Sequence, residues 1–478
     1  MCNGKMYKYL GMVCLLIGIS ACTAPSGVTR TANPALPERY NGSLDTLGLT
    51  KIPWQDYFAD PYLTALIDTA LQNNQELNIT LQEIEISKNE VRTRKGEYLP
   101  FVDIKAGAGV DKVGRYTSRG ASEATTEIEP GREMPDPLPD YMIGAYATWE
   151  VDIWHKLRNG KKAAVARYLA SMEGKNFMVT NLIAEIATSY FELQALDNQL
   201  DIIDQNIAIQ DNALKTVRLQ KQAARVTELA VRKFEAEVLH TKSLKFNTKQ
   251  QIIEMENKIN FLLGRYPQPI RRNSATFSTT ALPSAIETGI PSQLMENRPD
   301  IRQAELELAA AKLDVKVAKA RFYPSFGISA GIGYRAFDAS YLVKTPESLI
   351  YSLAGDLTAP LINRNAIKAT YYSANAKQLQ TVYNYERTVL NAYMEVANEV
   401  SKIDNLKKSY ELKSQEVEAL AQSIRISNDL FKSTRADYME VLLTQRDALE
   451  SKFELIETKK EQMNALVAIY RNLGGGWQ

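Results

Sequence analysis

The sequence predicts a mainly α-helical chain that also carries a few β-strands of the kind found in membrane barrels. Three observations lead to this fold class. One pattern of elements returns 224 residues later, so the chain is built from two copies of one unit. Long stretches place apolar residues seven positions apart, which is typical of coiled-coil helices. Four short stretches alternate apolar and polar residues, which is the period of a β-strand.

The N-terminal residues predict export and a lipid anchor. Two lysines precede an apolar stretch over residues 10–19, which is the layout of a secretory signal peptide over residues 1–21. The residues Ile19-Ser20-Ala21-Cys22 resemble a bacterial lipobox, in which the cysteine receives a diacylglycerol. We therefore expect lipidation of Cys22; an ordinary signal peptide that happens to contain a cysteine is the alternative. Thr23 follows in place of an aspartate, which favours sorting to the outer membrane.

The composition argues against several classes of protein. Lys and Arg number 57 against 56 Asp and Glu, a balance that disfavours a nucleic-acid binder. No cysteine follows Cys22 and the chain has only two histidines, so neither a disulfide framework nor a multi-histidine metal site is expected. His155, beside Trp154, fits an interfacial position better than a proton relay. We expect no enzyme, no metal and no cofactor other than lipid on Cys22.

The repeat divides the chain into six parts. The segment from Asn73 to Pro100 matches the segment from Asn297 to Pro324. Each copy reads helix, strand, loop, strand, long helix, turn and helix. The predicted parts are the signal peptide 1–21, a lipidated linker or collar segment 22–60, a first repeat 61–264, a connector 265–296, a second repeat 297–474 and a tail 475–478.

Four alternating stretches predict two strands in each repeat. Their apolar residues are Val102, Ile104, Ala106, Ala108 and Val110; Ile143, Ala145, Ala147, Trp149 and Val151; Phe326, Ile328, Ala330, Ile332 and Tyr334; and Leu349, Tyr351, Leu353 and Leu357. Such strands suit a soluble sheet on a core or a membrane barrel, and export as a lipoprotein favours the barrel. A membrane barrel needs at least about eight strands, so several chains would have to combine. The strand count alone fits two copies or three.

Heptads define the long helices. The apolar residues spaced by seven are Val179, Ile186, Leu193, Leu200, Ile207 and Leu214; Val382, Val389, Val396, Ile403, Tyr410, Val417, Ile424 and Phe431; and Leu442, Leu449, Ile456, Met463 and Tyr470. This period predicts left-handed coiled-coil packing. A helix over about residues 156–221 roughly matches in length the predicted helices 61–97 and 228–263 laid end to end. Each repeat should therefore close as one long helix beside two shorter ones.

A motif in the second repeat resembles a known family. The run Asn297-Arg298-Pro299-Asp300-Ile301-Arg302-Gln303-Ala304-Glu305, followed by Ala318-Lys319-Ala320-Arg321-Phe322-Tyr323-Pro324, is similar to the TolC-type outer-membrane efflux channels and to their NodT-like lipoprotein branch. The resemblance covers essentially residues 22–476. It implies a homotrimer with a twelve-stranded barrel in the bacterial outer membrane and a helical tunnel in the periplasm. It also implies an equatorial collar built from residues 23–60, residues 265–296 and the C-terminal end.

The resemblance further implies partners and a cargo. The partners would be a periplasmic adaptor, also called a membrane fusion protein, and an inner-membrane efflux pump, often of the resistance-nodulation-division type. The channel would passively conduct drugs or other small toxic compounds. Adaptor docking would fall on two turns at the helix tips. These turns contain Ala224, Arg225, Val226 and Thr227 in the first repeat and Thr434, Arg435, Ala436 and Asp437 in the second, and both lack the usual glycine.

Charged residues supply the candidates for conduction and gating. The barrel-lumen candidates are Asp103, Lys105, Glu150, Asp152 and Asp356, and their mixed signs predict weak charge selectivity. Channels of the resembled family close at the tunnel end. There we expect Asp429 to form the gate ring and Arg425, one helical turn earlier, to tether it. Solvated charges on the outer face of a coiled coil are the alternative.

Two other functions stay open at this point. A periplasmic coiled-coil scaffold lipoprotein would explain the lipobox and the heptads, but not the paired strands. A type I protein-secretion channel would keep the conduit and change the cargo. The acidic, proline-rich loop 114–140 is expected to be extracellular.

Overall fold

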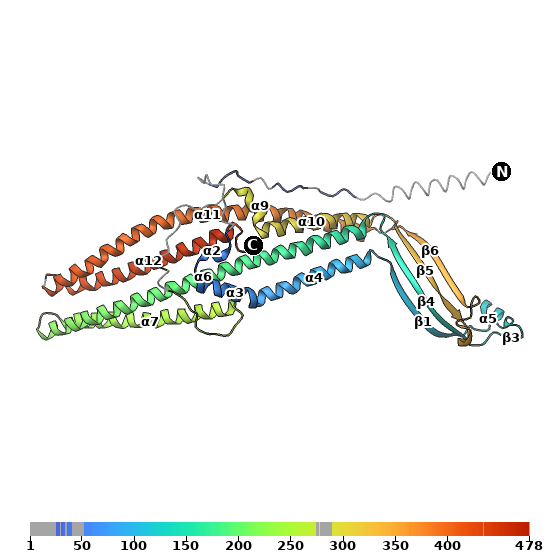
Figure 1. Cartoon of the computed structure of the whole chain (residues 1–478), viewed down its shortest axis with the longest axis horizontal. Helices are drawn as coiled ribbons and strands as arrows, with labels where there is room; N and C mark the ends of the chain where they lie inside the picture. The colour runs from blue at the N-terminus through green and yellow to red at the C-terminus, as the bar shows by residue number, and fades with distance from the viewer. Residues whose placement is uncertain are drawn as a thin grey trace. The chain divides into compact units, whose positions relative to one another are not determined.

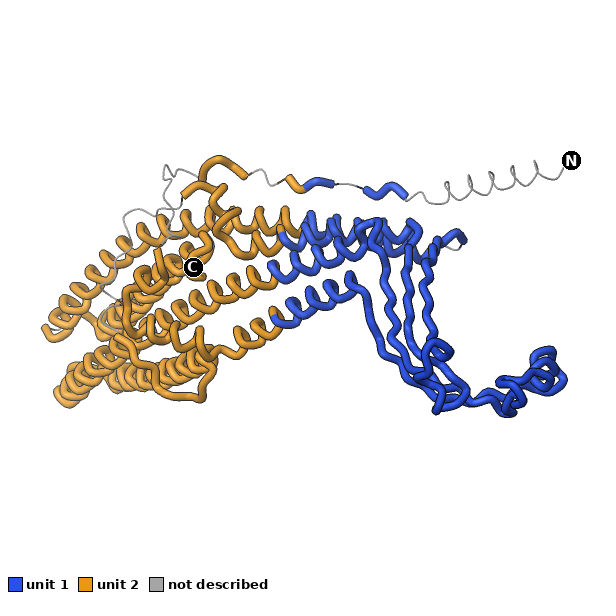
Figure 2. Tube along the Cα trace, turned by 45° about the vertical axis from the view of Figure 1, so that its right-hand side comes forward, with its two compact units in different colours: residues 1–31, 85–169, 306–383 blue, residues 32–84, 170–305, 384–478 orange. Residues whose placement is uncertain are grey.

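The computed structural model describes residues 25–28, 30–33, 36–40, 52–273, 277, 289–362, 364–433 and 435–477. The chain splits into two compact units, which Figure 2 colours separately. The first unit holds residues 1–31, 85–169 and 306–383, and the second holds residues 32–84, 170–305 and 384–478. Each unit therefore takes segments from both predicted repeats.

The first unit contains a four-stranded antiparallel sheet. Its strands are β1 (Phe101–Asp111), β4 (Leu138–Val151), β5 (Ser325–Ala336) and β6 (Leu349–Thr358). Their order across the sheet is β1-β4-β5-β6, as Figure 1 shows. The four predicted strands are all present, and the sheet joins the two strands of one repeat to the two strands of the other.

The register gives the sheet one polar and one apolar face. Glu150 lies opposite Gly327, which lies opposite Asp356, and Trp149 beside them lies opposite Ile328. Because residues directly opposite each other point to the same side, the alternation of each strand continues across all four. We call the side of Glu150 and Asp356 the polar face and the side of Trp149 and Ile328 the apolar face. The apolar face is exposed, with Ile104 82% and Leu353 79% accessible.

The connections at the far end of the strands have structure of their own. Helix α5 (Ser118–Glu123) and the hairpin of β2 (Glu127–Glu129) with β3 (Arg132–Glu133) lie within the predicted loop 114–140. The second connection holds the short helix η3 (Ala339–Tyr341). The two connections meet where the Arg132 guanidinium lies 5.4 Å from the Phe337 ring centre.

Four helices contribute residues to both units. They are α4 (Gln75–Glu97), α6 (Lys156–Gln222), α10 (Pro299–Ala320) and α11 (Asn365–Lys432). The long helices α6 and α11 have 67 and 68 residues, as the heptads predict. The heptad positions Ile186, Leu193, Val382, Val389 and Val396 are all buried, so the apolar seams pack against neighbouring helices.

The second unit adds the return helices. These are α7 (Glu228–Leu262) and α12 (Tyr438–Asn472), with the short helices α2 (Trp54–Phe58), α3 (Pro61–Asn73), η2 (Pro291–Gln293) and α9 (Leu294–Asn297). Ion pairs bridge α6 to α7, for example Lys242 with Asp211 at 3.2 Å, and α11 to α12 through Lys402 and Glu461 at 2.6 Å. An apolar core around Ile67, Ile186, Tyr190, Ile259 and Leu263 holds α3, α6 and α7 together.

The predicted continuous helix 61–97 is interrupted at Asn74. The backbone of Asn74 is extended, and its side-chain oxygen accepts a hydrogen bond from the Leu77 amide at 2.9 Å. Its side-chain nitrogen donates to the Leu262 carbonyl at 2.9 Å. The residue thus ends α3, caps α4 and satisfies the end of α7. Within the described part of the chain, no helix combines the length and apolar character needed to cross a membrane.

Candidate functional site

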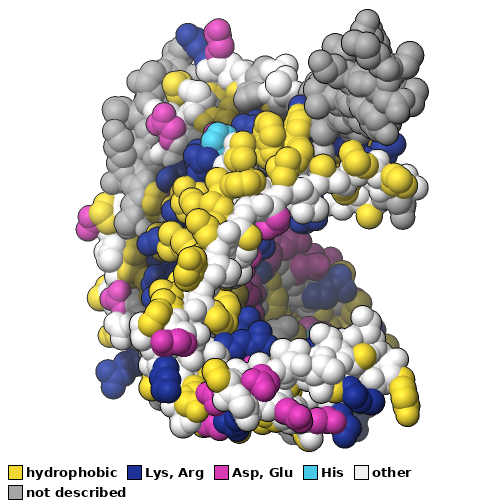
Figure 3. Space-filling model, turned by 90° about the vertical axis from the view of Figure 1, so that its right-hand side faces the viewer, with side chains coloured by type: hydrophobic (Ala, Val, Ile, Leu, Met, Phe, Trp, Pro, Cys, Tyr) yellow, Lys and Arg dark blue, Asp and Glu magenta, His cyan; other side chains and the backbone are white. Residues whose placement is uncertain are grey.

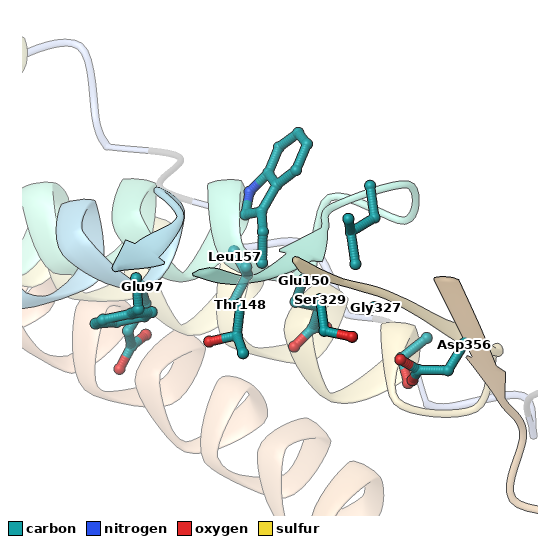
Figure 4. Close-up of a pocket in the computed structure, with 11 residues that line it drawn as sticks. Glu97, Thr148, Glu150, Leu157, Gly327, Ser329 and Asp356 are labelled. Atoms are coloured by element: carbon teal, nitrogen blue, oxygen red, sulfur yellow. The ribbon is translucent and has the colours of Figure 1, made fainter. Parts of the chain in front are cut away.

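The polar face of the sheet carries a pocket at the end of the strands nearest α4. Its volume is about 530 Å³, and Glu97, Glu150 and Asp356 supply carboxylates to it. Figure 4 shows these three side chains on the same side of the sheet. Lys156, in the first turn of α6, forms an ion pair with Glu150 at 2.5 Å. The pocket therefore holds more acid than base, and water can reach it.

Glycines on the polar face let larger side chains lie flat against the sheet. A Cβ atom at Gly327 would meet the Asp356 carboxylate oxygens at 2.9 Å, and one at Gly331 would meet the Tyr146 ring at 2.8 Å. The Lys105 ammonium lies 5.1 Å from the centre of the same Tyr146 ring. The glycines thus keep the space above the sheet open and fix where its charged and aromatic groups lie.

An ion pair marks the opposite end of the polar face. Arg335 of β5 donates two hydrogen bonds to the Asp140 carboxylate of β4, at 2.8 and 2.7 Å. This bidentate geometry neutralises both groups and ties the two central strands together. Neither this pair nor Glu97 is among the residues that the sequence predicts for the lumen. A charge directly after the alternating stretch Phe326–Tyr334 could have indicated Arg335 as a residue of the polar face.

The structure brings four of the five lumen candidates to the polar face. Asp103 and Lys105 project from β1 on the side that also carries Glu150 and Asp356. Among the candidates, Asp152 is different. It follows the last residue of β4, and its side chain is only 1% exposed, so its prediction as a lumen residue is wrong.

Asp152 instead begins the long helix α6. Its carboxylate accepts hydrogen bonds from the Leu157 and Arg158 amides at 2.9 Å each. It also forms an ion pair with the Arg158 guanidinium at 3.2 Å. Burial alone would raise the pKa of Asp152, but the hydrogen bonds from Arg158 and Leu157 hold it below its ordinary value. A buried aspartate at this position satisfies amides that the first helical turn leaves free.

The first tip turn connects α6 to α7. Ala224 has a φ of 58°, and the Arg225 amide donates to the Gln220 carbonyl at 2.9 Å. Ala224, Arg225 and Thr227 are exposed, while Val226 packs against an apolar cluster. Ala224 therefore takes the place of the usual glycine, and holding an alanine in the left-handed region strains the backbone by about 1 kcal/mol.

The second tip turn connects α11 to α12. The Arg435 amide donates to the Leu430 carbonyl at 2.9 Å, the counterpart of the bond in the first tip. Asp437 precedes the first residue of α12 and makes no side-chain cap. Thr434 lies outside the described residues. Phe431 and Val441 join Leu214 and Phe234 in one apolar cluster, so the two tips pack on each other.

The gate candidates lie close to the second tip. The Asp429 side chain is 76% exposed and pairs with Lys432 at 3.4 Å. Arg425 is also exposed, and among the described side chains no ion pair joins it to Asp429. The proposed tether is therefore not formed within this single chain. Cys22, the predicted lipid site, lies outside the described residues.

Buried or half-buried arginines anchor the start of the second repeat and the predicted connector. Arg298 is buried and binds Asp300 at 2.7 Å and Glu395 at 2.8 Å. Burial alone would lower the pKa of Arg298, but these two carboxylates raise it above its ordinary value. In the connector, Arg272 holds Asp197 and Glu256, each at 2.5 Å. Among the described residues, no group of three or more His, Cys, Asp or Glu is placed to bind a metal ion.

Comparison with known proteins identifies the relatives of this chain. The family model described as outer membrane efflux protein matches residues 66–265 and 290–475. The pyoverdine export outer membrane protein OpmQ of Pseudomonas aeruginosa is 26% identical, over 89% of this chain and 87% of the relative. The toluene efflux pump outer membrane protein TtgI of Pseudomonas putida is 26% identical, over 98% of both chains. The probable outer membrane lipoprotein SilC of Salmonella typhimurium is 24% identical, over 89% of this chain and 88% of the relative.

Solved structures share the fold. The open state of the MtrE outer membrane channel of Neisseria gonorrhoeae aligns with a TM-score of 0.82 at 22% identity, over 95% of this chain and 98% of that one. A crystal structure of CusC aligns with a TM-score of 0.80 at 23% identity, over 95% and 99%. The predicted fold class, a helical tunnel with a membrane barrel, is thereby confirmed. The matched family, the whole-length relatives and the shared fold agree, and the chain belongs to the outer membrane efflux protein family.

Proposed function

We propose that three copies of this chain close their sheets into one twelve-stranded barrel, which conducts small compounds out of the cell without its own energy source. One observation carries the proposal. The four-stranded sheet has an exposed apolar face and a polar face, and no described strand pairs with the outer edges of β1 and β6. In lipid, every backbone amide and carbonyl needs a partner, so these edges require strands from other copies.

The conduit would work with a periplasmic adaptor and an inner-membrane pump. Relatives named for pyoverdine export and for toluene efflux support an efflux role, and their different cargoes indicate that cargo is not chosen by this fold. We infer that the pump, of the resistance-nodulation-division type, selects drugs or other toxic small molecules. The adaptor would dock on the exposed tip residues, Arg225 and Arg435 among them.

A lipid on Cys22 would hold the N-terminus at the membrane. The lipoprotein name of SilC supports this assignment. The course of the following residues is consistent with it, because Val28 and the Asn375 side chain of α11 exchange two hydrogen bonds, at 3.1 and 3.0 Å. The N-terminal segment therefore lies along α11 shortly after the proposed anchor.

Conduction would be gated at the tips and shaped in the barrel. With threefold symmetry, Asp429 would become a ring of three carboxylates that Lys432 only partly neutralises. In the barrel, Asp103, Lys105, Glu150 and Asp356 would line the lumen from the polar face. Their mixed signs favour a wide, weakly selective path.

Planar-bilayer recording tests the proposal. Purified full-length protein should produce discrete conductance steps, and its mass in detergent should equal three chains. A coiled-coil scaffold would produce no steps at any protein concentration. Conductance steps from a species whose mass is not that of three chains would contradict the trimer but would still support a channel function.

A further inference from the structure

The helices next to the strands are strongly basic. Residues 85–100, 152–169, 306–324 and 359–383 contain 16 Lys and Arg and 6 Asp and Glu, a net charge of +10, whereas the whole chain carries +1. The first unit therefore concentrates positive charge on the helical segments that adjoin its sheet.

Two matching groups of basic residues stand out within this excess. Lys88, Arg92 and Lys95 lie on α4, and Lys312, Lys316 and Lys319 lie on α10. Each member of the first group is 224 positions before its counterpart, so both repeats carry the group at the same place. The spacing of four and three residues puts each group on one stripe of its helix. All six side chains are exposed. We call these groups the basic triplets.

The basic triplets face away from the polar side of the sheet. Glu97, the last residue of α4, points to the polar side with Glu150, as Figure 4 shows. At about 100° per residue, Lys88, Arg92 and Lys95 lie roughly 140° to 180° around the helix from Glu97. The triplet on α4 is therefore on the side that corresponds to the apolar face. Its counterpart on α10 occupies the same positions in the repeat.

Apolar and aromatic groups lie between the strands and the triplets. The Trp154 ring stacks on Tyr323 at 4.7 Å, and its indole nitrogen donates to the Pro324 carbonyl at 2.7 Å. Just after β6, Leu361 is 59% exposed and Ile362 is 90% exposed. The space-filling view shows hydrophobic side chains gathered into a band that charged side chains flank (Figure 3). An apolar face, then aromatic residues, then lysines is the order that a protein shows from the bilayer core to the headgroups.

Few acids neutralise the triplets. Lys88 pairs with Glu85 at 2.7 Å, but position 309, the equivalent of Glu85 in the second repeat, is an alanine. Among the described side chains, no ion pair involves Lys95, Lys316 or Lys319. We propose that the basic triplets bind the anionic headgroups of phospholipids in the periplasmic leaflet of the outer membrane, and so fix the depth of the barrel. Clustered lysines and arginines beside a membrane segment attract anionic lipid in this way.

Spin-labelled lipids test the proposal with the full-length protein. The protein is reconstituted into phosphatidylcholine bilayers that contain spin-labelled phosphatidylglycerol or spin-labelled phosphatidylcholine, and the immobilised fraction of each is measured. Wild type should prefer phosphatidylglycerol. The variant K312Q/K316Q/K319Q should lower this preference, and adding K88Q/R92Q/K95Q should reduce it about fivefold or more. High salt should have a similar effect on wild type.

A matched control separates the triplets from charge in general. The variant K215Q/K233Q/K249Q removes three exposed lysines from α6 and α7 in the second unit and should keep the wild-type preference. An unchanged preference in the six-residue variant would overturn the proposal. The proposal would also be overturned if the six-residue variant kept the lipid preference but shifted the reversal potential of the channel current, because the triplets would then line the conduction path. Immobilised phosphatidylcholine in every variant shows that the barrel has inserted.

Discussion

Asn74 and Arg298 make the same contact in the two repeats. The Asn74 side chain donates to the Leu262 carbonyl at 2.9 Å, and the Arg298 guanidinium donates to the Asn472 carbonyl at 2.9 Å. Donors and acceptors correspond, since Asn74 lies 224 positions before Arg298 and Leu262 lies 210 before Asn472. Each bond satisfies the end of a return helix and joins it to the start of the helix that leads to the strands. The repeat thus preserves a contact while changing its chemistry.

The charged version of this contact should contribute more to stability. Arg298→Ala would leave Asp300 and Glu395 without their partner, and we expect it to lower the free energy of unfolding by about 3–5 kcal/mol. Asn74→Ala removes neutral hydrogen bonds and should cost about 1–2 kcal/mol. Denaturant unfolding of the purified protein measures both, and Arg271→Ala, at an exposed arginine, serves as the control. A larger loss for Asn74→Ala than for Arg298→Ala would refute this ranking.

The first tip should become more stable when its alanine is replaced by glycine. Ala224 has a φ of 58°, which a glycine adopts without strain, so Ala224→Gly should stabilise the turn, by less than about 1 kcal/mol because glycine also makes the unfolded chain more flexible. Hydrogen exchange of the Arg225 amide, which donates to Gln220, reports this directly as slower exchange. Ala436→Gly is the comparison in the second tip, because Ala436 does not have a positive φ. In Ala436→Gly, the Arg435 amide should exchange at the wild-type rate or faster. Slower exchange of the turn amide in both variants would argue against relief of strain.

Stability in acid should depend on Asp152. Its pKa is below the ordinary value in the folded chain, so its ionised form stabilises the fold above about pH 4, the value of a free aspartate. That contribution is lost as the pH falls through the folded pKa. Asp152→Asn should cost about 1–2 kcal/mol at pH 7 and should flatten the decline of the melting temperature between pH 5 and pH 3. Asp103→Asn, on the exposed β1, should retain the wild-type slope. An identical slope in all three proteins would exclude Asp152 as the cause.

Removal of the Asp429 charge should make the closed channel leak without unfolding it. Its ion pair with Lys432 is exposed at 3.4 Å, so Asp429→Ala should change stability by less than about 1 kcal/mol. We expect greater basal conductance in planar bilayers. Asp404→Ala is a close control, because Asp404 forms a similarly exposed pair with Lys408 on the same helix. Equal leakage from the two variants would remove Asp429 from the gate.

The periodicity of the sequence predicts the helices and strands. Contacts between residues far apart in the sequence decide where a helix breaks and how it is capped. The alternation at Val102–Val110 and the heptad from Val382 to Phe431 correctly predicted a strand and a helix, because each pattern depends only on local spacing. The break at Asn74 depends on a carbonyl almost 190 positions later, and no local signal reveals it. The alternation wrongly predicts Asp152 as a lumen residue, because polar alternation continues one residue beyond the end of β4.

In the proposed trimer, the gate and tip residues would act through neighbouring copies, and the spacing of residues within one chain does not encode such contacts. Asp429 and Arg435 are exposed, which either a ring of three charges or a solvated coiled coil would produce. The basic triplets show the opposite case. They are visible in the sequence alone, since Lys88, Arg92 and Lys95 recur as Lys312, Lys316 and Lys319.

Crosslinking the two edges of the sheet tests the central claim, that three chains close one barrel. Cysteine is introduced at Ala106 of β1 together with Tyr351, Leu353 or Gly355 of β6, all on the apolar face. Two strands separate β1 from β6, about 14 Å in all, so a disulfide cannot form within one chain. After oxidation in the membrane, at least one pair should give a denaturing-gel ladder that ends at three chains. The absence of any crosslink in all three pairs, or a ladder that continues beyond three, would contradict the account.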